Sequence, residues 1–168
     1  MGPDGSFQMR NVSPGDYDLV VGTAASADDS YVSAIRAGDE DAFSGIHVGS
    51  QPLGLLRIIL KGNGGAVKVT VKDTDGKPQP NCPVEIVPDP PRHPQRALYS
   101  SCTTDAGGIC AALGIAPGDY RVFAFPESRN IDLRNARELA RIEDSGRPFK
   151  SGEGEKRSIE VNPIPDDQ

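Results

Sequence analysis

The chain of 168 residues contains no tryptophan, and aromatic residues of all kinds make up 5% of it. It has two histidines, His47 and His93, and neither lies in the HxxE spacing typical of zinc peptidases. No segment matches a GxxxxGK phosphate-binding loop or a GxGxxG dinucleotide fingerprint. No set of Ser, His and Asp residues indicates nucleophilic catalysis. The sequence therefore predicts no catalytic residue, no cofactor and no metal site.

Basic clusters and long apolar segments are also absent. The 18 Lys and Arg residues are outnumbered by 24 Asp and Glu, and none of the basic residues form a run, which excludes a nucleic-acid surface. The longest apolar stretch, 53–60, is interrupted by Gly54 and Arg57 and is too short to span a bilayer. The N-terminal residues have no signal-peptide pattern. We expect neither nucleic acid binding nor direct membrane insertion.

The most informative stretch present is 103–124, which reads TTDAGGICAALGIAPGDYRVFA. It predicts a hairpin turn, a short strand, a Pro-Gly corner and a second strand. The same pattern occurs at 4–21 without a gap, at a constant offset of 103 residues. The block shared by the two copies is Pro14, Gly15, Asp16 and Tyr17 against Pro117, Gly118, Asp119 and Tyr120. An ungapped repeat of this span predicts parts of two related β modules.

Alternating apolar residues predict the strands on both sides of a glycine-rich break, KGNGG, at 61–65. One helix is expected at 131–144, started by Asn130 or Asp132 and stopped by Gly146 and Pro148. The predicted strands are 6–10, 16–21, 31–36, 46–48 and 55–60 before the break, and 66–73, 84–87, 98–104, a short strand with Cys110 and Ala112, 119–125 and 156–161 after it.

These elements predict an all-β fold of two tandem parts. Residues 1–62 would be a partial β-sandwich module, 65–163 a complete module with one short helix, and 164–168 a tail. Because the first repeat starts almost at the N-terminus, we expect the chain to be a fragment. We also expect 1–62 to be less stable than 65–163 and to be completed by upstream sequence or a second copy. Its exposed apolar faces would carry Phe7, Met9, Tyr17, Leu19, Tyr31, Ile35, Leu56 and Ile58.

The chain resembles the carboxypeptidase regulatory-like family, a transthyretin-like (prealbumin-like, Cna-B-like) sandwich. The resemblance is carried by GGAVKVTVKDTDGKPQPNCPVEIV, by TTDAGGICAALGIAPGDYRVFAF and by the helix followed by SGRPFKSGEGEKRSIEV. It covers 65–163 fully and 4–22 in part, and it implies an antiparallel β-sandwich. The family's usual aromatic residue at the Cys110 position is absent.

The resemblance also implies a function. It implies a non-catalytic structural or protein-interaction module of a larger bacterial envelope or secreted protein, located outside the cytoplasm. Its partners would be neighbouring domains of the same protein or another envelope protein. The alternative is a carbohydrate-binding module, because the fold is similar to starch-binding domains. Sugar sites use exposed aromatic platforms, for which the candidates are Tyr31, Phe43, Tyr99 and Phe149.

Two further motifs are similar to functional sites but favour simpler structural interpretations. Asp73, Asp75 and Gly76 are similar to the start of a calcium loop, but the closing Glu is missing, which favours a plain turn. An internal isopeptide bond would need Lys68 or Lys72 with Asn162 and Glu85. By alternation both lysines and Asn162 point away from the core, which favours surface lysines.

The chain has three cysteines. Cys102 and Cys110 flank the turn of the central stretch, and both fall at inward-facing positions of strands that we expect to be adjacent and antiparallel. They either form a disulfide or act as small buried hydrophobic residues, and the sequence leaves both alternatives open. Cys82 has no counterpart in this arrangement.

Overall fold

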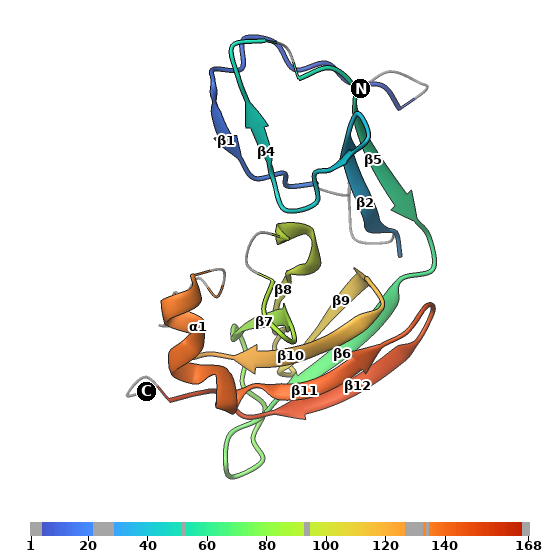
Figure 1. Cartoon of the computed structure of the whole chain (residues 1–168). Coiled ribbons are helices and arrows are strands. Elements are labelled where there is room, and N and C mark those ends of the chain that lie inside the picture. Colours follow the sequence, from blue (N-terminus) through green and yellow to red (C-terminus); the bar gives the residue numbers. More distant parts are fainter. Residues whose placement is uncertain are drawn as a thin grey trace.

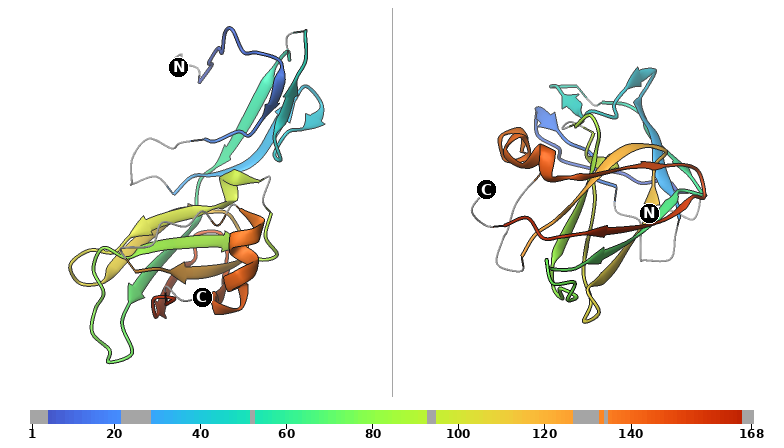
Figure 2. Two further views of the ribbon diagram at one scale, coloured as in Figure 1. Left: turned by 90° about the vertical axis from the view of Figure 1, so that its left-hand side faces the viewer. Right: turned by 90° about the horizontal axis from the view of Figure 1, so that it is seen from below.

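The computed structural model describes residues 5–21, 29–51, 53–92, 95–126, 133 and 135–165. Strands dominate it, with one short α-helix, so the predicted all-β fold is confirmed. Figures 1 and 2 show two groups of strands, one above the other, joined where β5 leads into β6. We call residues 5–61 the N-terminal part and residues 65–165 the C-terminal part.

The N-terminal part contains two small sheets. One pairs β1 with β4, and the other has the order β3-β2-β5. The predicted strands at 31–36, 46–48 and 55–60 are confirmed as β2, β4 and β5. The bounds are β1 Gly15–Tyr17, β2 Tyr31–Ala37, β3 Glu40–Asp41, β4 Ile46–Val48 and β5 Leu56–Lys61.

The C-terminal part contains a sheet of order β11-β10-β7-β8 facing one of order β12-β6-β9. The pairs are antiparallel, as predicted, except for β12 and β6, which run parallel. The turn at 152–155 carries the chain from the first sheet to the second, so β12 arrives in the direction of β6. The bounds are β6 Gly65–Val71, β7 Pro83–Pro88, β8 Ser100–Thr103, β9 Ile109–Ile115, β10 Gly118–Ala124, β11 Arg147–Ser151 and β12 Lys156–Val161.

Apolar side chains at alternate positions of the strands fill the space between these two sheets. On β6 the side chains of Val67, Val69 and Val71 are buried, whereas Lys68 is exposed. They pack in one cluster with Cys82, which precedes β7, and with residues of β7, β9 and β10, namely Val84, Ile86, Cys110, Ala112, Ile115, Tyr120, Val122 and Ala124. This period of two is what a sheet with one buried face requires.

A second cluster lies between the helix and the outer face of the β10 sheet. It contains Val87, Phe123, Phe125, Leu133, Leu139, Ile142 and Ile164. Ile164 belongs to the segment predicted as a tail, yet it is buried, and its backbone N–H donates to the carbonyl oxygen of Ala124 at 2.8 Å. Ile164 is therefore packed against the β10 sheet.

The helix α1 spans Ala136–Ile142 and is shorter than the predicted 131–144. Asn135 is its N-cap, because its side-chain oxygen accepts the Arg137 backbone N–H at 3.0 Å. The two predicted caps, Asn130 and Asp132, lie outside the described residues. In the described part of the chain, no helix combines the length and apolar content needed to cross a bilayer.

Two predicted strands differ from the structure, and two observed strands, β3 and β11, were not predicted. Residues 6–10 do not form a strand, and the strand expected at 16–21 is reduced to β1. Strand β11 was not predicted, because Gly146 and Pro148 are residue types that typically end a helix and are rare within strands. Pro148 is accommodated because β11 is the edge strand of its sheet, paired with β10 alone.

Candidate functional site

The repeat seen in the sequence extends to a strand pair that the sequence comparison missed. Strand β1 pairs antiparallel with β4, and β10 pairs in the same way with β11. The matched pairs are Gly15↔Val48, Asp16↔His47 and Tyr17↔Ile46 in the first case, and Gly118↔Ser151, Asp119↔Lys150 and Tyr120↔Phe149 in the second. Every one of these residues is related to its counterpart by the same offset of 103. Sequence comparison missed the β4 copy because its side chains differ from those of β11.

The backbone of the first copy also has the conformation of the second. The φ angles of counterpart residues are 79° and 71° for Gly5 and Gly108, 57° and 66° for Asn11 and Gly114, and 158° and 159° for Gly15 and Gly118. Left-handed φ angles at two matched positions are unusual outside glycine and asparagine. The backbone at Gly5 and Asn11 therefore repeats that at Gly108 and Gly114, which lie just before and within β9.

The side chains of the two copies differ in exposure. Strand β9 is paired with β6 in one sheet, with Val67 opposite Ala112 and Val69 opposite Cys110, whereas among the described residues no strand pairs with 7–12. This missing partner is the physical reason why the strand predicted at 6–10 does not form. The exposed fractions are 44% for Phe7, 57% for Met9 and 42% for Val12, against 6% for Cys110, 4% for Ala112 and 3% for Ile115.

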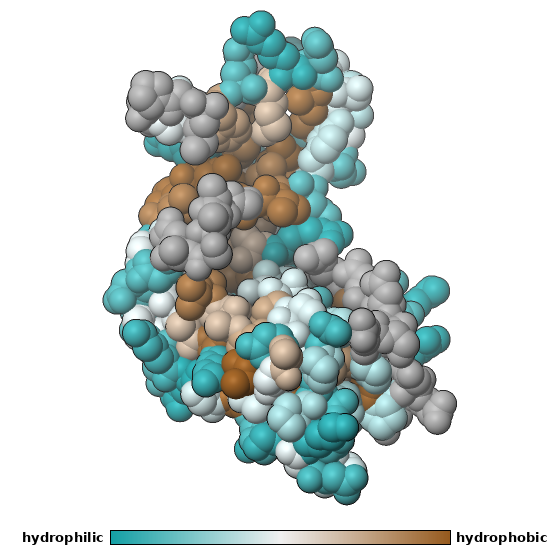
Figure 3. Space-filling view, turned by 180° about the vertical axis from the view of Figure 1, so that it is seen from behind, coloured by the Kyte–Doolittle hydropathy of each residue, from teal (hydrophilic) through white to brown (hydrophobic). Residues whose placement is uncertain are grey.

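The exposed residues of 5–12 line a groove of about 750 Å³ in the N-terminal part. Its other walls come from β1, β4 and the segment that leads into β5. Figure 3 shows hydrophobic residues gathered over this part of the molecule. The apolar lining residues are Phe7, Met9, Val12, Tyr17, Leu19, Ile46, Val48, Leu53, Leu55 and Leu56.

Not every residue of the predicted exposed face lies on the surface. Phe7, Met9 and Tyr17 are exposed, but Tyr31 and Ile35 are buried, so the expectation is wrong for these two. Ile35 packs with Val32 and Ala42 in a small core of the N-terminal part. This core is partly covered by residues from both parts of the chain: Leu19, Val21, Ala37, Phe43, Ile46, Leu56, Ile58 and Ala97.

Polar contacts tie the two parts together beside this small core. The Arg96 guanidinium lies 2.6 Å from the Asp18 carboxylate, and the N–H of Gly64, the residue just before the C-terminal part, donates to the Asp29 carbonyl oxygen at 2.7 Å. The Tyr31 hydroxyl donates to a Glu153 carboxylate oxygen at 3.3 Å. Burial, with the nearby Glu153 charge, raises the pKa of Tyr31. The N-terminal part is thus anchored to the C-terminal part away from the groove.

The repeated Pro-Gly-Asp-Tyr block begins just before β1 and β10 and forms the first three residues of each strand. In both copies the tyrosine ring lies over the glycine, with ring atoms 3.7 Å from a Cβ built on Gly15 and 3.4 Å from one built on Gly118. The Tyr17 hydroxyl donates to the Ser13 carbonyl oxygen at 2.8 Å, and the tyrosine is 37% exposed. Tyr120 is 2% exposed, and burial raises its pKa to about 12, against a smaller opposite effect of Arg92.

Cys102 and Cys110 form a disulfide with their Cα atoms 6.0 Å apart. We expected their strands, β8 and β9, to be adjacent and antiparallel, and this is wrong. Strand β8 pairs with β7 in one sheet, and β9 pairs with β6 in the other. Each is the edge strand of its own sheet, so the disulfide joins the two sheets. Cys110 is buried, Cys102 is half-buried against the same core, and Cys82 is buried outside the disulfide.

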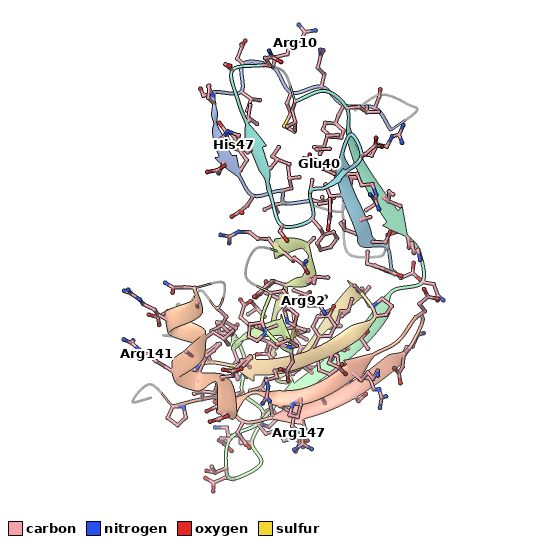
Figure 4. All side chains as sticks on the ribbon, in the orientation of Figure 1. Arg10, Glu40, His47, Arg92, Arg141 and Arg147 are labelled. Atoms are coloured by element: carbon pink, nitrogen blue, oxygen red, sulfur yellow. A yellow bond between two sulfur atoms is a disulfide. The ribbon has the colours of Figure 1, made fainter. Side chains whose placement is uncertain are left out.

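The acidic turn at 73–78 is a plain turn stabilised by its own first residue. A carboxylate oxygen of Asp73 accepts the N–H groups of Asp75 at 3.0 Å and Lys77 at 2.8 Å. Among the described residues, no three His, Cys, Asp or Glu side chains lie close enough to hold a metal ion. His47 lies on the β1–β4 sheet (Figure 4), with Nδ1 2.7 Å from Asp16, and His93 is outside the described residues.

The proposed isopeptide partners lie at the surface, as alternation predicts. Lys68 is exposed, and the Lys72 ammonium forms an ion pair with Glu160. The Asn162 side-chain amide donates to the Lys72 carbonyl oxygen at 2.8 Å. The interpretation of these lysines as surface residues is confirmed.

None of the four aromatic residues considered for sugar binding forms an exposed platform. Tyr31 is buried, Phe43 packs against the core of the N-terminal part, and Tyr99 packs against the cluster under the helix. The Phe149 ring is stacked on Tyr120 with centroids 5.6 Å apart. The exposed aromatics are Phe7 and Tyr17, and both belong to the apolar groove.

Comparisons with known proteins give a distant likeness in structure only. No family model matches the chain, and no curated protein sequence matches it. The Bacillus anthracis TIE protein matches 64% of this chain and 19% of its own length, at 16% identity and a TM-score of 0.40. BcpA, the major pilin subunit of Bacillus cereus, matches 66% of this chain and 33% of its own length, at 12% identity and a TM-score of 0.37. The chain thus spans a third or less of the solved proteins to which it is similar.

Proposed function

We propose that the chain is a non-catalytic structural and protein-interaction unit of a larger bacterial envelope or secreted protein. The observation that carries this proposal is the contrast between its two copies of one β motif. One copy is buried in a core whose two sheets are joined by a disulfide. The other leaves an apolar groove of about 750 Å³ uncovered. Exposed apolar surface of this kind is typical of protein interaction sites.

We further propose that residues 1–62 form a partial module, 65–163 a complete one, and that the protein works outside the cytoplasm. The disulfide supports that location, because such bonds persist in oxidising compartments and are rare in the cytosol. Neighbouring domains of the same protein or another envelope protein are the expected partners. The buried or packed positions of Tyr31, Phe43, Tyr99 and Phe149 argue against a sugar platform.

Lysine-directed cross-linking of the intact parent protein on cells, followed by mass spectrometry, tests this proposal. We expect links from exposed lysines such as Lys68 to neighbouring domains or another envelope protein, and we expect the chain to be cleaved by protease added to intact cells. If the added protease does not cleave the parent protein because it lies inside the cell, the proposed location outside the cytoplasm is contradicted. Release of product from peptides or polysaccharides by the purified chain, abolished by a point substitution, would contradict the absence of catalysis.

A further inference from the structure

The segment 7–12 belongs to none of the sheets in the described part of the chain, and it borders the apolar groove. Its φ angles at Gly5 and Asn11 match those at Gly108 and Gly114 around β9. Phe7, Met9 and Val12 line the groove. The counterpart of this segment in the second copy is the paired strand β9, and the segment's own apolar side chains line one cavity. Only the neighbouring strand is missing.

The C-terminal part shows what kind of strand occupies the corresponding position. There β6 runs antiparallel to β9, and its valines at 67, 69 and 71 point into the core above Tyr120. Applying the offset of 103 places Phe7 and Met9 at the positions of Cys110 and Ala112, which face Val69 and Val67. Tyr17, at the position of Tyr120, lines the floor of the groove.

We propose that the groove accepts a β-strand donated by another polypeptide. The donated strand pairs antiparallel with 6–12 and points a valine or isoleucine at every second position into the groove. This inference rests on the proposed function as an interaction unit and names the kind of partner. Strand addition suits the site because backbone hydrogen bonds supply affinity, while alternate side chains filling a pocket supply specificity.

A second copy of this chain does not supply such a strand. Among the described strands, β6 has the required alternation of valines, and it is paired on both edges, with β12 and with β9. Its three valines are buried. Releasing β6 would require opening the core of the C-terminal part, whose sheets the disulfide joins.

The test uses the oxidised full chain and a synthetic peptide, GAVKVTVK, with the sequence of residues 65–72. A control peptide of identical composition, GAVVVKTK, lacks the alternation of valines. Binding is followed by fluorescence anisotropy of the labelled peptide, and the bound region by hydrogen exchange of the backbone amides. Met9→Lys places a charge in the groove, and Leu113→Lys is its matched control. Leu113 is a similarly exposed apolar residue of the C-terminal part that does not line the groove.

We expect saturable one-to-one binding of GAVKVTVK, at least tenfold weaker binding of the control peptide, and slower exchange at 6–12 in the complex. Met9→Lys should weaken binding at least tenfold, whereas Leu113→Lys should leave it within twofold. The inference is overturned by an absence of binding, by equal binding to the Met9→Lys variant, or by protection elsewhere in the chain. Self-association that protects 6–12 without peptide would also overturn it, in favour of a second copy. If cross-links to neighbouring domains persist while the peptide does not bind, the proposed function stands and only the strand inference fails.

Discussion

Tyr17 and Tyr120 show how much a residue's environment changes when the sequence around it does not. Both follow a Pro-Gly-Asp corner, and both rings lie over the preceding glycine. The sequence predicted their equivalence from this block, because the corner is a local structure. It could not predict that Tyr120 is buried and Tyr17 exposed, because burial depends on β6, which lies far from Tyr120 in sequence.

The raised pKa of Tyr120 predicts a loss of stability at high pH. Its pKa is about 12 in the folded chain, against about 10 for an unfolded tyrosine. Below pH 10 the phenol is protonated in both states, so the full stability is present. As the pH rises from 10 to 12, the unfolded state loses the proton first and is favoured, by roughly 2–3 kcal/mol over this window.

Chemical denaturation between pH 8 and 12 measures this effect. In the Tyr120→Phe variant the free energy of unfolding should decline less with pH than in the wild type, since the titrating group is gone. A decline of equal steepness in both proteins would contradict the assignment to Tyr120. The measurements from pH 8 to 9 serve as the control for the packing effect of the lost hydroxyl.

The disulfide between Cys102 and Cys110 predicts a second effect of single residues. It closes a loop with a sequence separation of 8, for which loop-closure entropy gives a stabilisation of roughly 2–3 kcal/mol. The Cys102→Ser, Cys110→Ser double variant should lose about this much in urea denaturation. A reducing agent should destabilise the wild type and leave the double variant unchanged; equal sensitivity of the two proteins would argue against the disulfide as the source.

At the scale of the elements, strands with alternating apolar residues and firm turn signals were predicted well. Strands β2, β4, β5, β6 and β12 illustrate this. The strand predictions fail where the presence of a neighbouring strand determines whether a strand forms. Residues 6–10 have a strand pattern without a paired strand, and β11 contains a proline that an edge strand tolerates. The groove could be anticipated as exposed apolar surface, but its walls depend on the β1–β4 pair, whose similarity to β10–β11 appears only in the register.

Hydrogen exchange of the chain alone can compare matched segments at the offset of 103. Strand β9 is an edge strand, so every second one of its amides bonds to β6, and we expect the bonded amides within 110–112 to exchange slowly. The amides at 7–9 are in no strand ladder among the described residues and should exchange within seconds under the same conditions. Equal protection of the two segments at all protein concentrations would mean that 7–9 has a strand partner that the structure does not contain.

At the scale of the whole molecule, the junction between the two parts depends on Gly64, which has no room for a side chain. A Cβ on Gly64 would lie 2.6 Å from the Asp29 carbonyl oxygen and 2.9 Å from the Gly114 Cα, both backbone atoms. The sequence predicted a boundary at KGNGG from composition alone. It could not predict that the break is a packed contact, because Asp29 and Gly114 are distant in sequence.

Gly64→Ala should therefore disturb the junction, whereas Gly62→Ala, with no atom within 4 Å of its added Cβ, is the matched control. We expect the first variant to lose about 1–3 kcal/mol of unfolding free energy, as overpacking against backbone does, and the second to change by less than about 0.5 kcal/mol. Small-angle scattering should show a larger radius of gyration for Gly64→Ala alone. A Gly64→Ala protein with unchanged stability and dimensions would contradict this account of the junction.

The parallel pairing of β6 with β12 has a consequence for a protein under mechanical tension. These are the first and last strands of the C-terminal part, aligned from Ala66 beside Lys156 to Val71 beside Val161. Pulling the chain at residues 65 and 161 loads opposite ends of the pair, so all the ladder hydrogen bonds resist the force at the same time. Pulling at 65 and 156 loads the same end and breaks the bonds one after another. In an optical trap, the first attachment should need clearly the higher force to open the fold, so that a chain extended between its neighbours would transmit tension instead of unravelling.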